Sequence, residues 1–224
     1  MTALSEVTAL VPMKHTSERA PGKNYRDFLG EPLFFQIIRT LTQVPEVAQI
    51  VVDTDSPKIM SLCRAEFPDV VCLQRDSRLL GSDVPMTSVI QAIASRIGAS
   101  WYLQTHSTNP LLRAATIRRA LGELKLSKAH DSIISVNRIQ ARLYGLNAEP
   151  LNHQTATLQR TQDMQPVFQE NSNLFVFRGQ EAVAGRRYGN RPLLFEMNAL
   201  EALDIDTEED FEVAERIAAS YSRG

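Results

Sequence analysis

Short runs of apolar and β-branched residues alternate with longer amphipathic segments along the first two thirds of the chain. An apolar run of roughly four to eight residues between polar turns is typical of a buried strand, and apolar positions three and four residues apart are typical of a helix. The pattern predicts strands over 7–13, 47–52, 70–73, 101–104 and 132–136, and helices over 32–41, 57–67, 86–97 and 114–124.

This alternation predicts an α/β fold with a mostly parallel sheet and helices on both of its faces. Parallel neighbours need long crossover connections, and the predicted helices supply them. Two further strands, over 174–177 and 193–197, and a terminal helix over 208–221 complete the pattern. We therefore expect residues 1–224 to form a single domain.

The alternation breaks between about residues 137 and 171, where polar residues dominate without a clear period. A disordered loop is one interpretation, but a long loop without structure of its own is uncommon inside a compact domain. We favour an extended hairpin, or arm, over residues 138–172 that packs on a partner subunit.

Composition narrows the class of protein. Hydrophobic residues make up 43% and charged residues 22%, an ordinary globular balance. The formal net charge of −2 argues against a broad basic surface for nucleic acid, although a local cationic pocket remains compatible with it. The sequence shows neither a signal peptide nor a membrane-spanning stretch, so the cytoplasm is the expected location. Cys63 and Cys72 lack metal-ligand spacing and are expected to be buried thiols.

Candidate chemistry is expected after the strands, because ligands of open parallel sheets bind at the carboxyl ends of the strands. Residues 14–24, after the first strand, contain three cations, two hydroxyls and a Pro-Gly pair. Lysine and arginine bind phosphate oxygens by charge-assisted hydrogen bonds, and glycine lets backbone approach a ligand. The loop is therefore a candidate phosphate site, although it lacks the spacing of a Walker loop. A solvated surface loop is the alternative.

A second candidate is the acidic segment 203–210. Asp204 and Asp206 are separated by one residue, so in an extended chain their side chains point the same way and can share a hard cation such as Mg²⁺. The same residues also resemble a helix N-terminus in which Asp206 or Thr207 is the cap. Both interpretations can hold together.

Residues 13–24 read M-K-H-T-S-E-R-A-P-G-K-N. They resemble the motif A-R-x-x-S-K-x-x-P-x-K-N that opens the CMP-N-acylneuraminate synthetase family. Ser17, Pro21, Lys23 and Asn24 match in place, whereas Lys14 replaces the family's arginine and Glu18 replaces its lysine. Later segments resemble further motifs of the family in the same order, namely residues 53–55, 80–83, 103–111, 131–136, 160–177 and 203–210.

The resemblance implies a Rossmann-like domain that binds CTP and Mg²⁺, and a homodimer in which the arm completes the sugar site of the partner. Carried over by position, the expected site has Lys14 and Lys23 as catalytic residues and Asp204 and Asp206 as magnesium ligands. The nucleotide-binding residues are expected to be Lys14, Ser17, Arg19, Gly22, Lys23, Asn24, Ser82 and Asp83. The acceptor sugar is expected to contact Gln104, His106, Arg160 and Asn171.

The implied reaction couples CTP to an acidic nonulosonic, sialic-acid-like sugar and gives the CMP-sugar and pyrophosphate. An enzyme acting on 3-deoxy-manno-octulosonate (KDO) or another acidic sugar is the nearest alternative. KDO-activating enzymes carry a Q-G-D-E-P pattern after the fourth strand, whereas residues 104–110 contain no acidic residue, which favours the nonulosonate branch. A catalytically inactive sugar-nucleotide-binding protein of the same fold is the alternative outside enzymes.

Overall fold

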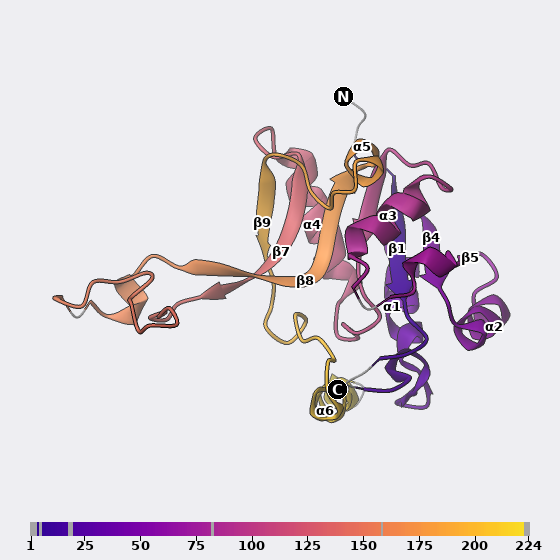
Figure 1. The fold of residues 1–224 in the computed structure, drawn as a ribbon, viewed down its shortest axis with the longest axis horizontal. Helices are drawn as coiled ribbons and strands as arrows, with labels where there is room; N and C mark the ends of the chain where they lie inside the picture. The colour runs from indigo at the N-terminus through magenta and orange to yellow at the C-terminus, as the bar shows by residue number, and fades with distance from the viewer. Residues whose placement is uncertain (1–3, 5, 18–19, 82, 158, 222–224) are drawn as a thin grey trace.

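A seven-stranded sheet runs through the middle of the protein in the order β5-β4-β1-β6-β8-β7-β9 (Figure 1). The computed structural model describes residues 4, 6–17, 20–81, 83–157 and 159–221. The strands of this sheet are β1 (Val7–Met13), β4 (Val47–Thr54), β5 (Val71–Gln74), β6 (Trp101–Gln104), β7 (Ser132–Ile139), β8 (Val167–Arg178) and β9 (Pro192–Glu196). A second, two-stranded sheet is formed by β2 (Asp27–Phe28) and β3 (Glu31–Pro32).

Along the chain, helices follow or separate the strands of the sheet, and the last helix comes after the last strand. They are α1 (Leu33–Thr42), α2 (Pro57–Glu66), α3 (Met86–Ala94), α4 (Ala114–Leu126), α5 (Gly179–Val183) and α6 (Glu208–Tyr221), with short 3₁₀ turns η1 (Lys23–Tyr25), η2 (Ser77–Leu79) and η3 (Thr161–Asp163). In the part of the chain that the structure describes, none of these helices has the length and apolar character needed to cross a membrane. Cys63 is buried as expected, whereas Cys72 is only partly buried.

β8 is the strand that departs from the parallel arrangement of the central sheet. It pairs antiparallel with β6 and with β7, whereas the pairs β1–β4, β1–β6, β4–β5 and β7–β9 are parallel. The mostly parallel sheet predicted from the sequence is therefore confirmed.

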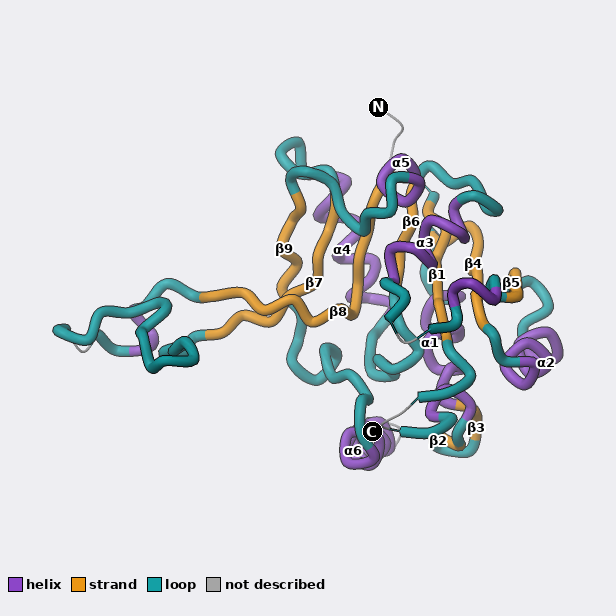
Figure 2. The backbone as a smooth tube through the Cα atoms, in the orientation of Figure 1, coloured by secondary structure: helices purple, strands orange, loops and turns teal. Residues whose placement is uncertain are grey.

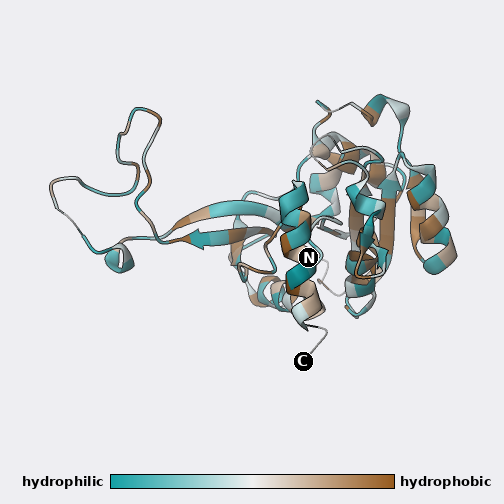
Figure 3. Cartoon of the chain, turned by 90° about the horizontal axis from the view of Figure 1, so that it is seen from below, coloured by the Kyte–Doolittle hydropathy of each residue, from teal (hydrophilic) through white to brown (hydrophobic). Residues whose placement is uncertain are grey.

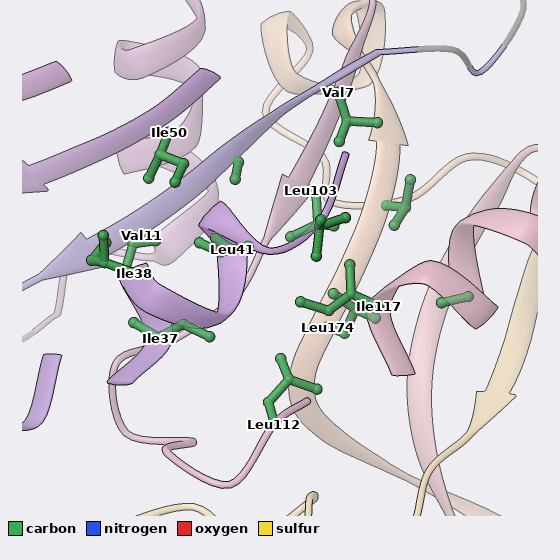
Figure 4. Packing of buried hydrophobic residues seen from close by; sticks show 14 of the residues in the cluster. Val7, Val11, Ile37, Ile38, Leu41, Ile50, Leu103, Leu112, Ile117 and Leu174 are labelled. Atoms are coloured by element: carbon green, nitrogen blue, oxygen red, sulfur yellow. The ribbon is translucent and has the colours of Figure 1, made fainter. Parts of the chain in front are cut away.

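Successive side chains of each strand point to opposite faces of the sheet and pack in two hydrophobic cores, one on each face. Val11, Leu103 and Leu174 point to the core beneath α1, α2 and α4 (Figure 4). Their neighbours Tyr102 and Phe175 point to the core beneath α3 and α5. In Figure 3 the strands of the central sheet are coloured mostly as hydrophobic, and hydrophilic residues are found on the helices around them. The helices thus cover both faces, as predicted.

β7 and β8 continue beyond the sheet as a two-stranded ribbon, which we call the β7–β8 ribbon (residues 136–139 and 167–170). Val136 pairs with Glu170 and Ile139 with Val167, and the loop 140–166 closes the far end. Figures 1 and 2 show the ribbon and its loop projecting away from the rest of the protein. Backbone hydrogen bonds between two strands do not require apolar side chains. The ribbon residues therefore showed no hydrophobic period in the sequence.

A large irregular bulge lies where the ribbon leaves the sheet, which we call the root of the ribbon. Ile134 pairs with Phe175 and Val136 with Glu170, so residues 171–174 of β8 lie opposite a single residue of β7. Asn171 fastens this bulge from inside: its Oδ1 accepts from Ser135 Oγ at 2.5 Å, and its Nδ2 donates to Asn137 Oδ1 at 3.0 Å. Bulges of this kind bend a strand and so change the direction in which the chain continues.

A buried ion pair joins the carboxyl ends of β4 and β5. Arg75 Nε donates to Asp53 Oδ1 at 2.5 Å, and the two side chains are 1% and 6% exposed. Burial raises the pKa of Asp53, and the adjacent Arg75 guanidinium acts in the opposite direction. The carboxylate therefore depends on Arg75 to stay charged inside the protein.

Replacing Arg75 by methionine should destabilise the protein by about 3–5 kcal/mol, because it leaves a buried carboxylate without its partner. Urea unfolding followed by circular dichroism measures this change. The double variant Asp53→Leu/Arg75→Met removes both charges and should recover most of the lost stability. A double variant no more stable than the single one would contradict the role given to the charge.

Candidate active site

An open cleft of about 670 Å³ lies at the carboxyl ends of β1 and β6. The chain crosses from one half of the sheet to the other between these two strands, which is where open α/β sheets bind ligands. The residues that line the cleft are Pro12, Met13, Lys14, Thr16, Ser17, Lys23, Asn24, Leu80, Met86, His106, Ser107, Thr108, Asp204 and Asp206.

The loop after β1 supplies the cations of the cleft. Lys14, Ser17 and Lys23 all line it, and Lys14 Nζ donates to the carbonyl oxygen of Gly81 at 3.4 Å on the opposite wall. Arg19, which we expected beside them, and Ser82 both lie outside the described residues. The described loop therefore brings two lysines and two hydroxyls, those of Thr16 and Ser17, to one concave surface.

Asn24 also lines the cleft, but both ends of its amide are used inside the protein. Its Nδ2 donates to the carbonyl oxygen of Lys14 at 2.8 Å, and its Oδ1 accepts from Ser107 Oγ at 2.7 Å. In this structure Asn24 thus joins the start of the first loop to the loop after β6. Its predicted contact with the nucleotide stays a prediction.

Gly22 gives the first loop its turn and does not line the cleft. Its φ is +66°, and a Cβ at this position would lie 2.8 Å from the Tyr25 ring. Glycine is required there for both reasons. The same loop is held from its other side by His15, whose backbone N–H donates to Asp55 Oδ1 at 2.7 Å.

The two aspartates reach the cleft because the segment between them is pinned to the loop after β6. Ile205 N donates to the Thr108 carbonyl oxygen at 2.9 Å, and Asn109 Nδ2 donates to the Leu203 carbonyl oxygen at 3.1 Å. Ile205 is fully buried, whereas Asp204 and Asp206 both line the cleft. The alternation expected of an extended segment is therefore present.

The start of α6 is capped by other residues. Thr207 Oγ1 accepts from Asp210 N at 3.2 Å, and Asp210 Oδ2 accepts from Thr207 N at 2.8 Å and from Asp206 N at 3.0 Å. This reciprocal pair satisfies backbone donors that the first turn of a helix leaves open. The cap is thus formed by Thr207 and Asp210, and the carboxylates of Asp204 and Asp206 remain directed to the cleft.

Lys23 joins the two halves of the predicted site. Its ammonium group donates to the carbonyl oxygen of Ile205 and lies 3.5 Å from Asp206 Oδ1. Asp204 is open to solvent on the cleft side, yet protein atoms crowd its carboxylate, and the lost hydration raises its pKa. Thr108 acts in the opposite direction by hydrogen bonding to the carboxylate.

The carboxylates of this cleft suit Mg²⁺. Among the described residues we find no cluster of three or more His, Cys, Asp or Glu side chains arranged to hold a metal by themselves. Magnesium usually takes only one or two carboxylates and completes its shell with water and substrate phosphates. Asp204 and Asp206, beside two lysines, provide such a partial set.

His106 lines the cleft, whereas Gln104 does not line it and contacts His106 from within the protein. Gln104 is fully buried at the end of β6, and its Nε2 lies 2.8 Å from His106 Nε2. Within the described structure its Oε1 is buried without a hydrogen-bond partner. Burial, with help from the charges of Arg187 and Lys23, lowers the pKa of His106 to about 4. His106 is therefore neutral at physiological pH.

Five of the expected site residues that the structure describes do not line the cleft, namely Gly22, Asp83, Gln104, Arg160 and Asn171. Arg160 lies in the loop of the arm, where its Nε donates to Asp163 Oδ2 at 2.7 Å. Asn171 is occupied in the bulge, and Asp83 is an exposed turn residue. The cleft also contains residues that were not expected from the sequence, among them Thr108, Leu80 and Met86. Of these three residues, only Thr108 had a signal in the sequence, namely its position shortly after β6.

Comparison with known proteins places the chain in a family. Residues 8–222 match the family described as Cytidylyltransferase. CMP-N,N'-diacetyllegionaminic acid synthase of Legionella pneumophila is 23% identical over 225 residues, which cover 94% of this chain and 95% of that protein. A 3-deoxy-manno-octulosonate cytidylyltransferase of Geobacter sulfurreducens is 27% identical over 141 residues, 63% of this chain. The chain spans about half of the length of that second relative, 52%.

Solved structures share the fold. A CMP:2-keto-3-deoxy-manno-octonic acid synthetase in complex with CTP superposes with a TM-score of 0.72 at 14% identity, over 97% of this chain and 100% of the other. The 4-diphosphocytidyl-2C-methyl-D-erythritol synthase of Anaerococcus prevotii gives 0.68 at 9% identity, over 96% and 97%. At such identities the likeness concerns the fold, and the family follows from the match over residues 8–222: the chain belongs to the cytidylyltransferase family.

Proposed function

We propose that this protein couples CTP to an acidic nonulosonic, sialic-acid-like sugar and releases pyrophosphate. The observation that carries the proposal is the meeting of Lys23 with the segment that holds Asp204 and Asp206, in the cleft at the ends of β1 and β6. A triphosphate with its metal ion needs both cations and carboxylates within one small volume. The family match supplies the reaction class.

The choice of acceptor rests on two features of the chain. The relative named for legionaminic acid matches from end to end, whereas the relative named for KDO matches over about half of its length. Residues 104–110 also lack the acidic residue of the KDO pattern. A KDO-type enzyme remains the second candidate, because that relative is the more identical of the two over the part that matches.

In the proposed reaction the sugar hydroxyl oxygen attacks the α-phosphorus of CTP, and its proton passes to solvent or to a carboxylate such as Asp206. The bond from the α-phosphorus to the bridging oxygen breaks, and pyrophosphate leaves with the electron pair. Lys14 and Lys23 would neutralise the negative charge on the phosphates. Lys23 is suited to this because its side chain is only 11% exposed and is already held by Ile205 and Asp206. It therefore needs little reorganisation when CTP binds.

Asp204 and Asp206 would hold the magnesium ion. When bound, this ion neutralises phosphate charge and orients the leaving group. Thr108 would keep the Asp204 carboxylate in place, and the Thr207–Asp210 cap would fix the backbone beside Asp206.

The proposal includes a homodimer. The arm leaves several large apolar side chains exposed, as is typical of surfaces that contact another chain. They are Tyr144, Leu146, Leu151 and Phe168. A second copy packed on the arm would cover them, and Arg160 would then be carried toward the cleft of the partner.

The function is tested by incubating the protein with CTP, Mg²⁺ and each of three acids: N-acetylneuraminic acid, N,N'-diacetyllegionaminic acid and KDO. We expect pyrophosphate release with a nonulosonic acid. Release with KDO alone would favour the second candidate. Binding of CTP without release for any acid would indicate a non-catalytic sugar-nucleotide-binding protein.

Lys23→Ala should lower kcat/KM by about 10²–10³, since it removes a preorganised positive charge at the phosphates. Pyrophosphate release measures the loss, and thermal unfolding checks the fold. Lys128→Ala, at an exposed position on the protein surface, is the matched control. Near-normal turnover of Lys23→Ala would remove Lys23 from the proposed mechanism.

Asp206→Asn should raise the Mg²⁺ concentration needed for half-maximal activity by about tenfold or more, because a charged ligand of a hard cation is lost. Titration of activity with MgCl₂ gives this value. Glu209→Gln, which removes one acidic charge from the exposed first turn of α6, should leave the titration unchanged. If both variants titrate like the wild type, Asp206 does not hold the metal.

A further inference from the structure

Arg187, between α5 and β9, is a half-buried cation that the protein itself leaves poorly satisfied. Its side chain is 22% exposed, and its nearest charged partner is Glu170, whose Oε1 lies 3.5 Å from the guanidinium. In the described part of the chain we find no hydrogen bond donated by this guanidinium. A guanidinium has five N–H donors, so a group in this position can bind a further acceptor.

A chain of contacts links Arg187 to His106, which lines the cleft. Its guanidinium carbon lies 4.1 Å from the centre of the Phe175 ring. Phe175 of β8 is paired directly with Gln104 of β6, and Gln104 contacts His106, which lines the cleft. Burial lowers the pKa of Arg187, and its charge helps to lower the pKa of His106. Arg187 therefore acts electrostatically on the region around Gln104 and His106.

Arg187 comes from a different part of the chain than the lysines that suit phosphates. Lys14 and Lys23 belong to the loop after β1 and its turn, whereas Arg187 follows α5 and packs on β8. Near Arg187 the buried Oε1 of Gln104 has no partner among the described residues, and the fully buried Phe175 ring lies against the guanidinium. The partly exposed guanidinium, held against this ring, is the group that can contact a ligand, and it suits the carboxylate of a sugar. The planar fork of arginine matches the two oxygens of a carboxylate.

We infer that Arg187 binds the carboxylate of the acidic acceptor sugar and so selects acidic over neutral sugars. The inference rests on the proposed function and deepens it, because it gives the acceptor charge a partner within the same chain. It replaces the sequence-based expectation for Arg160, whose guanidinium is paired with Asp163 in the arm. Glu170 would share the guanidinium with the substrate, since its Oε1 lies 3.5 Å from Arg187 Nη2.

The test uses the acid that the wild-type protein turns over best among N-acetylneuraminic acid, N,N'-diacetyllegionaminic acid and KDO. Arg187→Gln should raise the KM for that acid by about 10- to 100-fold, the loss expected for a charge-assisted hydrogen-bonded pair, and leave the KM for CTP unchanged. Arg187→Lys should recover part of the loss. Arg186→Gln, at the neighbouring exposed arginine that pairs with Glu181, is the matched control and should behave as wild type.

The methyl ester of the same acid separates recognition from a structural role. For the wild type, the KM for the ester should exceed the KM for the acid by a similar factor. For Arg187→Gln the two KM values should be alike, because the ester and the substitution remove the same interaction. Additive losses would overturn the inference. Glu170→Gln gives a second control: if Arg187 served only to pair with Glu170, this variant would show the same raised KM as Arg187→Gln.

The outcomes for the inference and for the proposed function are distinct. If the wild type releases pyrophosphate with none of the three acids, the proposed function fails and the inference fails with it. If the wild type uses an acid and Arg187→Gln keeps its KM, only the inference is wrong. If Arg160→Gln rather than Arg187→Gln loses the discrimination between acid and ester, the carboxylate is bound by the arm.

Discussion

The contact between the Lys23 ammonium group and the Ile205–Asp206 segment joins parts of the chain that are 183 residues apart in sequence at Asp206. Everything proposed for the cleft depends on this contact. It brings the cations of the first loop and the carboxylates near the C-terminus to the same concave surface. The carbonyl oxygen of Ile205 and the carboxylate of Asp206 also lower the energy of a lysine that is mostly removed from water.

The central sheet was predictable because each of its strands has its own local pattern. Val11, Leu103 and Leu174 belong to short apolar runs, and the helices between such runs show their own period. The arm was predicted as an extended hairpin over residues 138–172, but its two strands were not placed within it, because residues 167–170 are held by backbone pairing and their side chains are largely solvated. The helix α5 was also missed, since five residues are too few to show a helical period.

For the site, sequence located the segments better than it located the roles of their side chains. The spacing of Asp204 and Asp206 was sufficient to predict that both face one way, and the structure places both in the cleft. Asn24 and Asn171 illustrate what sequence did not reveal. Their amides are engaged with residues that are near them only after folding, so their hydrogen bonds have no local signature. Arg187 had no signal for the same reason: its neighbours Phe175 and Glu170 belong to β8 and come near it only after folding.

The bulge at the root of the ribbon has a consequence for how this architecture can vary. Over residues 171–174 the backbone ladder between β7 and β8 is interrupted, and the gap is bridged by the side chains of Ser135, Asn137 and Asn171. The direction in which the ribbon leaves the body is thus set by a few polar groups instead of by the twist of the whole sheet. Substitutions at these positions can re-aim the projection while the strands that carry the cleft keep their register.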